Sequence, residues 1–275
     1  MNEEKRTILT QSTDRYKNPF VPQGFAYVTG EWNTGFVIAD EFGNEFTWVP
    51  VGWLESNGTL DGISFDSKFG LRNWYNYDFS KEGWHEEVPS YILTSINTWG
   101  GFYFSSYTAS IENGKIVFKK GYLPLIKKSF DEAMELEATF KTNSAEVNHC
   151  LMLGSAYDSV CQWIIQDKTK TKSEIVDDST YLGNYANNEK YHSKVEEVEL
   201  LPTGSNPDWC IKNIYDLAGN VVEFTQEKHN NGRIVLRGGN YRVVGRYYPI
   251  ADRYFREPSS RTVNLASFRS MLFHK

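Results

Sequence analysis

The amino-acid sequence predicts an α+β fold, and three observations lead to this class. Residues 35–51 alternate between apolar and polar positions on both sides of a short glycine-containing segment, as the two strands of a β-hairpin do. Two later segments place apolar residues at helical spacing directly behind a capping pattern. Much of the remaining chain is polar and aperiodic, so hydrophobic periodicity predicts two helices beside short strands, joined by long loops.

The beginning of the chain predicts a leader followed by the hairpin. Residues 1–19 are polar and aperiodic, and we expect them to form a flexible leader. The first six residues, Met-Asn-Glu-Glu-Lys-Arg, lack the apolar stretch of a signal peptide, and no apolar run approaches the roughly 18 residues of a membrane span. We therefore expect a protein that is made in the cytoplasm and does not insert into a membrane. The hairpin loop falls at residues 40–44.

The segment 53–122 is crowded with aromatic residues, and two interpretations of it stand. These side chains either fill the core of a fold that is poor in regular structure, or they form an aromatic surface for contact with a glycan or a protein. The aromatic residues are Phe65, Phe69, Trp74, Tyr75, Tyr77, Phe79, Trp84, Trp99, Phe102, Tyr103, Phe104 and Tyr107.

Each predicted helix has a start signal and an apolar face. Ser129 stands three residues before Glu132, which is the capping-box spacing, and predicts a helix over about 130–141. Ser155 and Asp158 repeat that spacing at the head of a second helix, whose apolar face includes Cys161. Residues 168–172 then read as a solvated helix end and loop. Residues 175–208 are mostly polar and predict a long surface excursion.

Composition restricts the class of protein. The chain has 275 residues, of which 40% are hydrophobic and 23% are charged, so it is long enough for one large domain or two small ones. Three cysteines, an odd number, argue against a disulfide framework, and Cys161 is expected to be a buried thiol. The net charge of −6 is too mild to suggest a nucleic-acid partner. Residues 226–275 nevertheless carry +7, which indicates a binding face, internal ion pairs, or both.

Five ordered blocks of the sequence carry a resemblance to a known family. They are Gly24-Phe25 with Phe46–Val51, Leu151–Trp163, Asn213–Thr225, Leu236–Tyr241 and Ala266–Arg269. In this order and spacing they resemble the formylglycine-generating-enzyme, or sulfatase-modifying-factor, family. The resemblance implies a C-type-lectin-like variant of the α+β class, formed by one domain over residues 20–275, with two main helices, short antiparallel strands and long ordered loops. Segment 53–122 departs from the family pattern.

The resemblance does not extend to catalytic residues. The family's copper-dependent oxidases use a pair of cysteines just before the last block, because soft thiolates hold Cu(I). The corresponding residues 245–270 contain no cysteine, and the last one is Cys210. We therefore expect no copper and no enzymatic activity. His149, His192 and His274 are expected to be ordinary surface or half-buried residues, because none has a partner at ligand spacing.

The resemblance does imply a possible structural calcium site. Family members hold Ca²⁺ around the turn that matches residues 216–223, with oxygen ligands that suit this hard cation. Matched residue by residue, the side-chain ligands are Asp216 and Glu223, and the carbonyl ligands are those of Gly219 and Val221. The alternative is that the two carboxylates cap the turn or pair with Arg237.

Between the last two blocks lies a candidate binding surface, residues 241–264. Domains of this sort occur in phages and prophages, and some are targets of diversity-generating retroelements that rewrite residues in this region. Tyr and Arg are over-represented at binding hot spots, and Asn adapts to many partners. We expect Arg237 and Arg269 to be buried or paired. The candidate ligand-binding residues are Tyr241, Arg242, Val244, Arg246, Tyr247, Tyr248, Arg253, Tyr254, Arg256, Arg261 and Asn264.

The sequence thus favours a non-enzymatic module that is encoded by a phage or prophage and presents a variable surface to a host-cell or protein ligand. It would be virion-associated. Two alternatives stay open: an oxidoreductase of the formylglycine-generating type with non-cysteine ligands, and a structural component of a virion. A further alternative for residues 241–264 is a family loop of arbitrary composition.

Overall fold

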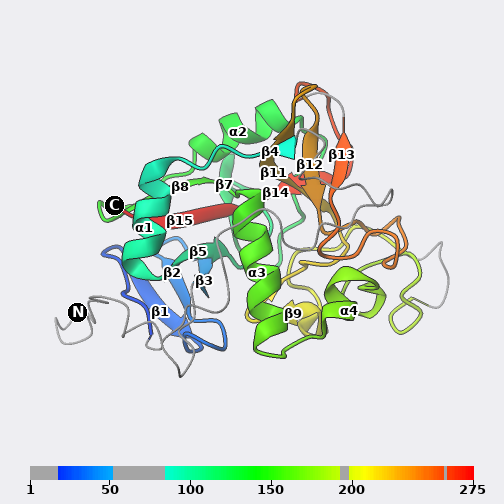
Figure 1. The fold of residues 1–275 in the computed structure, drawn as a ribbon, viewed down its shortest axis with the longest axis horizontal. Coiled ribbons are helices and arrows are strands. Elements are labelled where there is room, and N and C mark those ends of the chain that lie inside the picture. Colours follow the sequence, from blue (N-terminus) through cyan, green and yellow to red (C-terminus); the bar gives the residue numbers. More distant parts are fainter. Residues whose placement is uncertain (1–17, 52–83, 193–197, 257–258) are drawn as a thin grey trace.

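The protein has an α+β architecture in which one buried helix lies beside two sheets (Figure 1). The computed structural model describes residues 18–51, 84–192, 198–256 and 259–275. Helix α3 (Gly154–Gln166) contacts strand β3 of the larger sheet and strand β11 of the second sheet. The predicted α+β class is confirmed, and the several antiparallel sheets are compatible with a C-type-lectin-like fold.

The larger sheet contains the predicted hairpin. Its order is β1-β2-β3-β5-β15-β8, with antiparallel neighbours throughout. Asp40 Oδ1 accepts hydrogen bonds from the backbone N–H groups of Phe42 and Asn44, which close the hairpin turn. The strands are β1 (Phe25–Thr29), β2 (Val37–Asp40), β3 (Glu45–Pro50), β5 (Gly101–Ser105), β8 (Val147–Leu151) and β15 (Ser270–His274).

The second sheet carries the last two sequence blocks. Its order is β13-β12-β11-β14, and β4 pairs with the far end of β11. The pairing of β11 with β14 is parallel, which differs from the predicted antiparallel strands. Two short hairpins stand apart from both sheets. The strands are β4 (Trp84–His85), β6 (Ser110–Glu112), β7 (Lys115–Val117), β9 (Cys210–Ile211), β10 (Ile214–Tyr215), β11 (Val222–His229), β12 (Ile234–Arg237), β13 (Tyr254–Arg256) and β14 (Ala266–Phe268).

The predicted helix starts are correct only where the capping residue is close to the helix in sequence. Helix α2 (Phe130–Ala138) begins behind the capping box of Ser129 and Glu132, as predicted. Helix α3 begins at Gly154 without a side-chain cap from its N-cap residue, so the predicted cap at Ser155 is wrong. Glu86, distant in sequence, instead accepts hydrogen bonds from the N–H groups of Gly154 and Ser155. Shorter elements are α4 (Lys172–Val176), η2 (Thr180–Leu182) and η4 (Pro207–Trp209).

Helix α1 (Ser90–Trp99) was not predicted. It buries only Ile92, Ser95 and Ile96, so its apolar stripe is short. Phe102, Tyr103, Phe104 and Tyr107 are buried, which supports the core-filling interpretation for this part of the aromatic-rich segment. Residues 52–83, the side chain of Trp84 and the expected leader through residue 17 lie outside the described residues.

The polar stretch 175–208 is not the surface excursion that its composition predicts. Tyr185, Asn184 and Asn188 are buried, as is Thr203. Their polar atoms find partners inside the fold: Asn188 Nδ2 donates to Gly183 O at 2.8 Å, and Thr203 Oγ1 donates to Asp216 Oδ2 at 2.8 Å. A polar residue can be buried when its hydrogen bonds are satisfied, and a hydropathy pattern does not report this. Among the described residues, no helix is long and apolar enough to cross a membrane.

Candidate functional site

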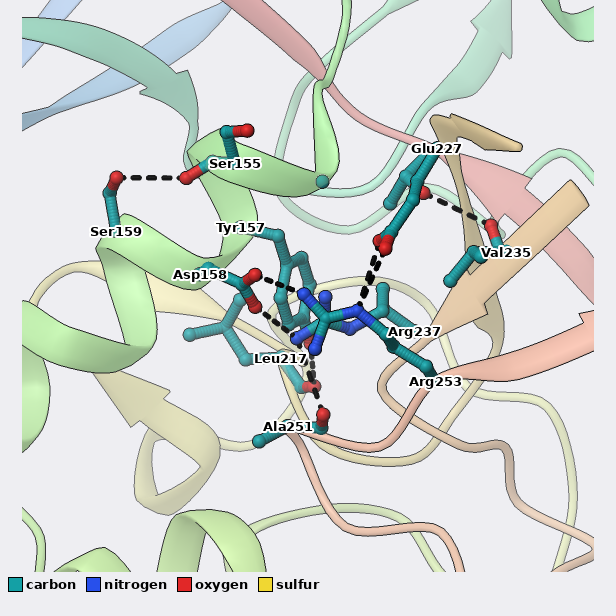
Figure 2. Close-up of polar contacts among 12 residues, drawn as sticks. Ser155, Tyr157, Asp158, Ser159, Leu217, Glu227, Val235, Arg237, Ala251 and Arg253 are labelled. Atoms are coloured by element: carbon teal, nitrogen blue, oxygen red, sulfur yellow. Dashed lines mark hydrogen bonds and ion pairs between the residues drawn. The ribbon is translucent and has the colours of Figure 1, made fainter. Parts of the chain in front are cut away.

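A buried ionic cluster connects α3 to strands β11 and β12 and to Arg253 inside the candidate binding segment (Figure 2). Arg237 Nη2 lies 2.7 Å from Asp158 Oδ1. Arg253 donates to the other oxygen of Asp158, and its Nε lies 3.0 Å from Glu227 Oε1. The side chains of Asp158, Arg237 and Arg253 have no exposed surface. Two guanidinium groups thus share one carboxylate, and Glu227 on β11 supplies the second negative charge.

The electrostatics of the cluster favour the charged form of Arg237 and act against that of Glu227. Burial alone would lower the pKa of Arg237, but Asp158 above all raises it beyond its ordinary value. Burial raises the pKa of Glu227, and the adjacent guanidinium of Arg253 opposes that rise. The Arg237 guanidinium also lies 4.6 Å from the centre of the Tyr157 ring. Because the opposite charges are paired and desolvated together, removing one partner would leave an uncompensated buried charge.

The cluster corrects one predicted site residue. Arg253 was expected on the ligand-binding surface, but it is 1% exposed and is paired with Asp158 and Glu227. Its neighbours Ile250, Ala251 and Asp252 are buried as well. The centre of segment 241–264 is therefore an internal anchor. Exposed residues lie on both sides of it, and we call them the first stretch (242–248) and the second stretch (259–264).

The first stretch presents arginine and tyrosine side chains to solvent. Arg242, Arg246 and Tyr247 are exposed, whereas Val244 and Tyr248 are half-buried. Arg246 Nη2 donates to the Tyr247 hydroxyl at 2.6 Å, and the guanidinium lies 4.6 Å from the centre of that ring. These two side chains therefore form one exposed unit rather than part of the core.

Residues 185–187 hydrogen-bond to the backbone of the first stretch and fix its position. The Tyr185 hydroxyl lies 2.9 Å from Gly238 O and 2.8 Å from Tyr248 O. Asn187 Oδ1 accepts from the Gly245 N–H at 3.1 Å. Gly239 has a φ of +70°, and a Cβ there would lie 2.7 Å from both the Tyr185 ring and Tyr248 O. Glycine at this position allows the loop to pack directly on Tyr185.

The second stretch and the start of the first line a groove of about 900 Å³. Five predicted site residues meet there: Tyr241, Arg242, Tyr254, Arg261 and Asn264. Arg242, Arg261 and Asn264 are exposed, Tyr254 is half-buried, and Tyr241 is buried at 8% exposure. Arg242 Nε donates to the Tyr241 hydroxyl at 3.1 Å.

The other predicted site residues do not belong to this groove. Val244, Arg246, Tyr247 and Tyr248 lie outside its lining, although the Tyr248 ring packs edge-on against Tyr254 at 5.3 Å. The side chain of Arg256 lies outside the described residues. Lys127 and Ile126 complete the groove from a segment that the sequence did not indicate. The isolated bridge between Lys128 and Val263 brings that segment to the groove, and such a long-range pairing has no local signal.

Arg237 and Arg269 are buried and paired, as predicted. The sequence left open that Arg237 pairs with Asp216 or Glu223, but its partner is Asp158. Arg269 Nε lies 2.7 Å from Glu223 Oε1, which also accepts from Thr108 Oγ1 at 3.0 Å. Arg237 therefore pairs with Asp158 and not with Glu223. His274 is also buried, stacked on Trp99 at 4.1 Å, which corrects the expected surface or half-buried position.

Of the two carboxylates expected to bind calcium, Asp216 already accepts hydrogen bonds, whereas one oxygen of Glu223 has no partner among the described residues. Asp216 Oδ2 accepts from Thr203 Oγ1 and from Gly204 N–H, both at 2.8 Å, so this carboxylate also fastens the preceding loop. Burial raises the pKa of Glu223, and Asp216 contributes in the same direction, so the two carboxylates interact. Glu223 Oε2 is buried and has no hydrogen-bond partner in the described part of the chain. A cation at Oε2 would satisfy that oxygen, and Asp216 and Glu223 would be the charged ligands of a calcium ion held there.

The three cysteines lie on β8, α3 and β9. Cys161 is fully buried, as predicted, and burial raises the pKa of its thiol to about 12. Burial also raises the pKa values of Cys150 and Cys210. Each thiol is therefore poorly disposed to form the thiolate that binds a soft metal.

Comparisons with known proteins give a distant structural likeness. No protein-family model and no curated protein sequence matches the chain. Among solved structures, variable protein 1 of Treponema denticola matches with a TM-score of 0.44 and 12% identity, over 91% of this chain and 99% of that one. PvdO from Pseudomonas aeruginosa matches with a TM-score of 0.43 and 13% identity, over 64% of this chain and 82% of that one.

Proposed function

We propose that this protein is a non-enzymatic ligand-binding module. The binding surface consists of the groove around Arg242 and Arg261 together with the exposed pair of Arg246 and Tyr247. The ligand is a protein or a cell-surface molecule. The observation that carries the proposal is that two exposed stretches, the first rich in Arg and Tyr and the second containing Arg261 and Asn264, flank a fully buried ionic anchor at Arg253.

This arrangement suits binding because it separates recognition from stability. The exposed side chains can be exchanged without disturbing the buried charges that fix the segment to α3 and β11. A preorganised backbone lowers the entropy that a loop loses on binding. Arginine and tyrosine supply most of the energy at typical protein interfaces.

The proposal includes the absence of oxidase activity. The region that carries catalytic cysteines in the resembling family has none here, and the pKa values of all three thiols are raised by burial. We expect a sulfatase-motif peptide that is incubated with the protein, copper and oxygen to keep its cysteine, as measured by mass spectrometry. Conversion of that cysteine to an aldehyde at an enzymatic rate would favour the oxidoreductase alternative.

The resemblance to phage and prophage domains extends the proposal to a diversified surface. The test is to sequence the gene and its surrounding DNA in related isolates. We expect a near-copy of the codons for 241–264, differing mainly at adenines, beside a reverse-transcriptase gene. Amino-acid variation should fall on exposed positions such as Arg242, Arg246, Tyr247 and Arg261.

The buried anchor provides the internal control for this test. Arg253 lies in the same segment but should stay unchanged, because it pairs with two buried carboxylates. Variation that is as frequent at Arg253 as at Arg246, or a segment without any variation or template copy, would contradict the diversified surface.

A further inference from the structure

Three positively charged side chains line the groove. Lys127, Arg242 and Arg261 line it and are exposed, and among the described residues none of the three forms an ion pair. Lys128, by contrast, lies 3.7 Å from Glu132 and is therefore partly neutralised. The described lining contains no carboxylate. A ligand with negative charge would complement these three cations, so the charge of the groove favours an acidic ligand.

The same groove has an aliphatic component. Ile126, Val263 and Leu265 are half-buried members of the lining, and Val222 is buried beneath them. The two tyrosines offer little open ring surface: Tyr241 is buried with the Arg242 guanidinium 5.2 Å from its ring centre, and the half-buried Tyr254 packs against Tyr248. Aliphatic side chains contact other apolar side chains well, whereas a sugar ring binds best on an open aromatic face.

Amide and hydroxyl groups complete the lining. Asn240, Thr262 and Asn264 can donate to and accept from a peptide backbone. The volume of about 900 Å³ is within the range of sites that enclose a compact ligand. The groove therefore offers cations, aliphatic surface and backbone-type hydrogen-bonding groups within one concave site.

We propose that the groove binds an acidic peptide segment of a protein partner, with carboxylates at Lys127, Arg242 and Arg261 and an apolar side chain against Ile126, Val263 and Leu265. This inference rests on the proposed function and names its ligand class. It assigns the groove, rather than the exposed pair of Arg246 and Tyr247, as the site of charge recognition.

The test selects a phage-displayed library of random nonapeptides on the immobilised full chain. We expect the enriched peptides to contain several Asp or Glu residues together with at least one apolar residue. Synthetic copies of these peptides should lose about tenfold in affinity for Arg261→Gln and for Arg242→Gln, because each substitution removes a charged hydrogen bond. Binding should also weaken as salt is raised, since the groove is open to solvent. The matched control is Lys115→Gln, which removes an exposed positive charge outside both the groove and the exposed pair of Arg246 and Tyr247 and should keep the affinity.

The outcomes separate this inference from the function on which it rests. Enriched peptides that lack acidic residues, or whose amide-substituted copies bind equally well, would overturn the acidic ligand while leaving the binding module intact. Tighter binding of oligogalacturonate, a carboxylated sugar, than of any selected peptide would overturn the peptide assignment. Failure to enrich any peptide would do the same. Peptide binding that is indifferent to substitutions in both the first and the second stretch would overturn the inference and the proposed function together.

Discussion

Arg246 and Arg253 lie in one segment but have opposite surroundings. Arg246 is exposed and contacts Tyr247, whereas Arg253 has no exposed side-chain surface and pairs with Asp158 and Glu227. A surface substitution changes stability by about 0.5 kcal/mol or less. Removing one partner of a buried ion pair costs about 3 to 5 kcal/mol, because the remaining charge stays desolvated.

We therefore predict that Arg253→Ala lowers the free energy of unfolding by about 3 kcal/mol or more, while Arg246→Ala leaves it nearly unchanged. Urea denaturation of both variants beside the parent measures the difference. Asp158→Asn serves as the second probe, because it removes the shared carboxylate charge and should destabilise the protein in the same direction. Equal stability of the Arg253 and Arg246 variants would show that the anchor does not hold the segment.

Asp216 and Glu223 allow a test of the calcium site at the same scale. If Ca²⁺ binds the native state alone, stability grows with free calcium by about 2.7 kcal/mol at a hundredfold excess over the Kd. We expect a chelator to lower the melting temperature of the parent, and Asp216→Asn to remove most of that response. Asp177 is exposed and lies at the end of α4, well before the turn in sequence, so Asp177→Asn is the matched control. A melting temperature that is indifferent to calcium in all three proteins would rule the site out.

At the scale of the element, the start of helix α3 depends on Glu86. Its carboxylate accepts from the Gly154 and Ser155 N–H groups, and burial together with Glu227 raises its pKa to about 7. The crowding is tight, because a Cβ at Gly154 would lie 2.7 Å from Glu227 Oε2 and 3.3 Å from Glu86 Oε1. The folded state thus binds a proton at Glu86 more strongly than the unfolded state, whose carboxyl titrates near 4.5.

This linkage predicts the sign of a pH effect. The contribution of Glu86 is fully present below pH 4.5 and is lost as the pH rises through about 7. We expect the loss to be about 1 to 3 kcal/mol, since the helix N-terminus offsets part of it. His274, whose pKa is lowered to about 4 by burial, contributes the opposite slope over part of this range.

The difference between the parent and Glu86→Gln isolates the Glu86 contribution. The free energy of unfolding of each protein is measured from pH 4.5 to 8. If Glu86 did not titrate, the parent and Glu86→Gln would differ by the same amount at every pH. We expect instead that the parent loses stability relative to the variant as the pH rises. Parallel curves for the two proteins would contradict the assignment.

The elements also show which features a sequence can predict. Helix α2 and the β2–β3 hairpin follow from local signals, the capping box at Ser129 and the Gly43 turn. The cap of α3 comes from Glu86, and the burial of Arg253 comes from Asp158 and Glu227, all distant along the chain. The sequence around an arginine does not indicate whether a buried carboxylate will lie beside it in the fold. The candidate surface was therefore predicted by its position between two motifs, but the anchor within it was not.

On the scale of the whole molecule, the segment after β12 joins two parts of the fold. Ala251 N–H donates to Ile175 O of α4, and Arg253 reaches α3 and β11. Figure 1 shows this segment beside α4, beyond the end of β12. The +7 charge of residues 226–275 is accordingly divided: Arg237, Arg253 and Arg269 are neutralised inside, while Arg242, Arg246 and Arg261 remain outside.

We expect the exposed residues of 241–264 to tolerate change while the scaffold stays folded. The most direct measurement is the fraction of protease-resistant, folded clones in two surface-displayed libraries of the full chain. One library randomises Arg242, Arg246 and Arg261, and the other randomises Arg237, Arg253 and Arg269, so each changes three arginines. We predict that most clones of the first library are folded and that few of the second are. Equal fractions of folded clones in the two libraries would contradict it.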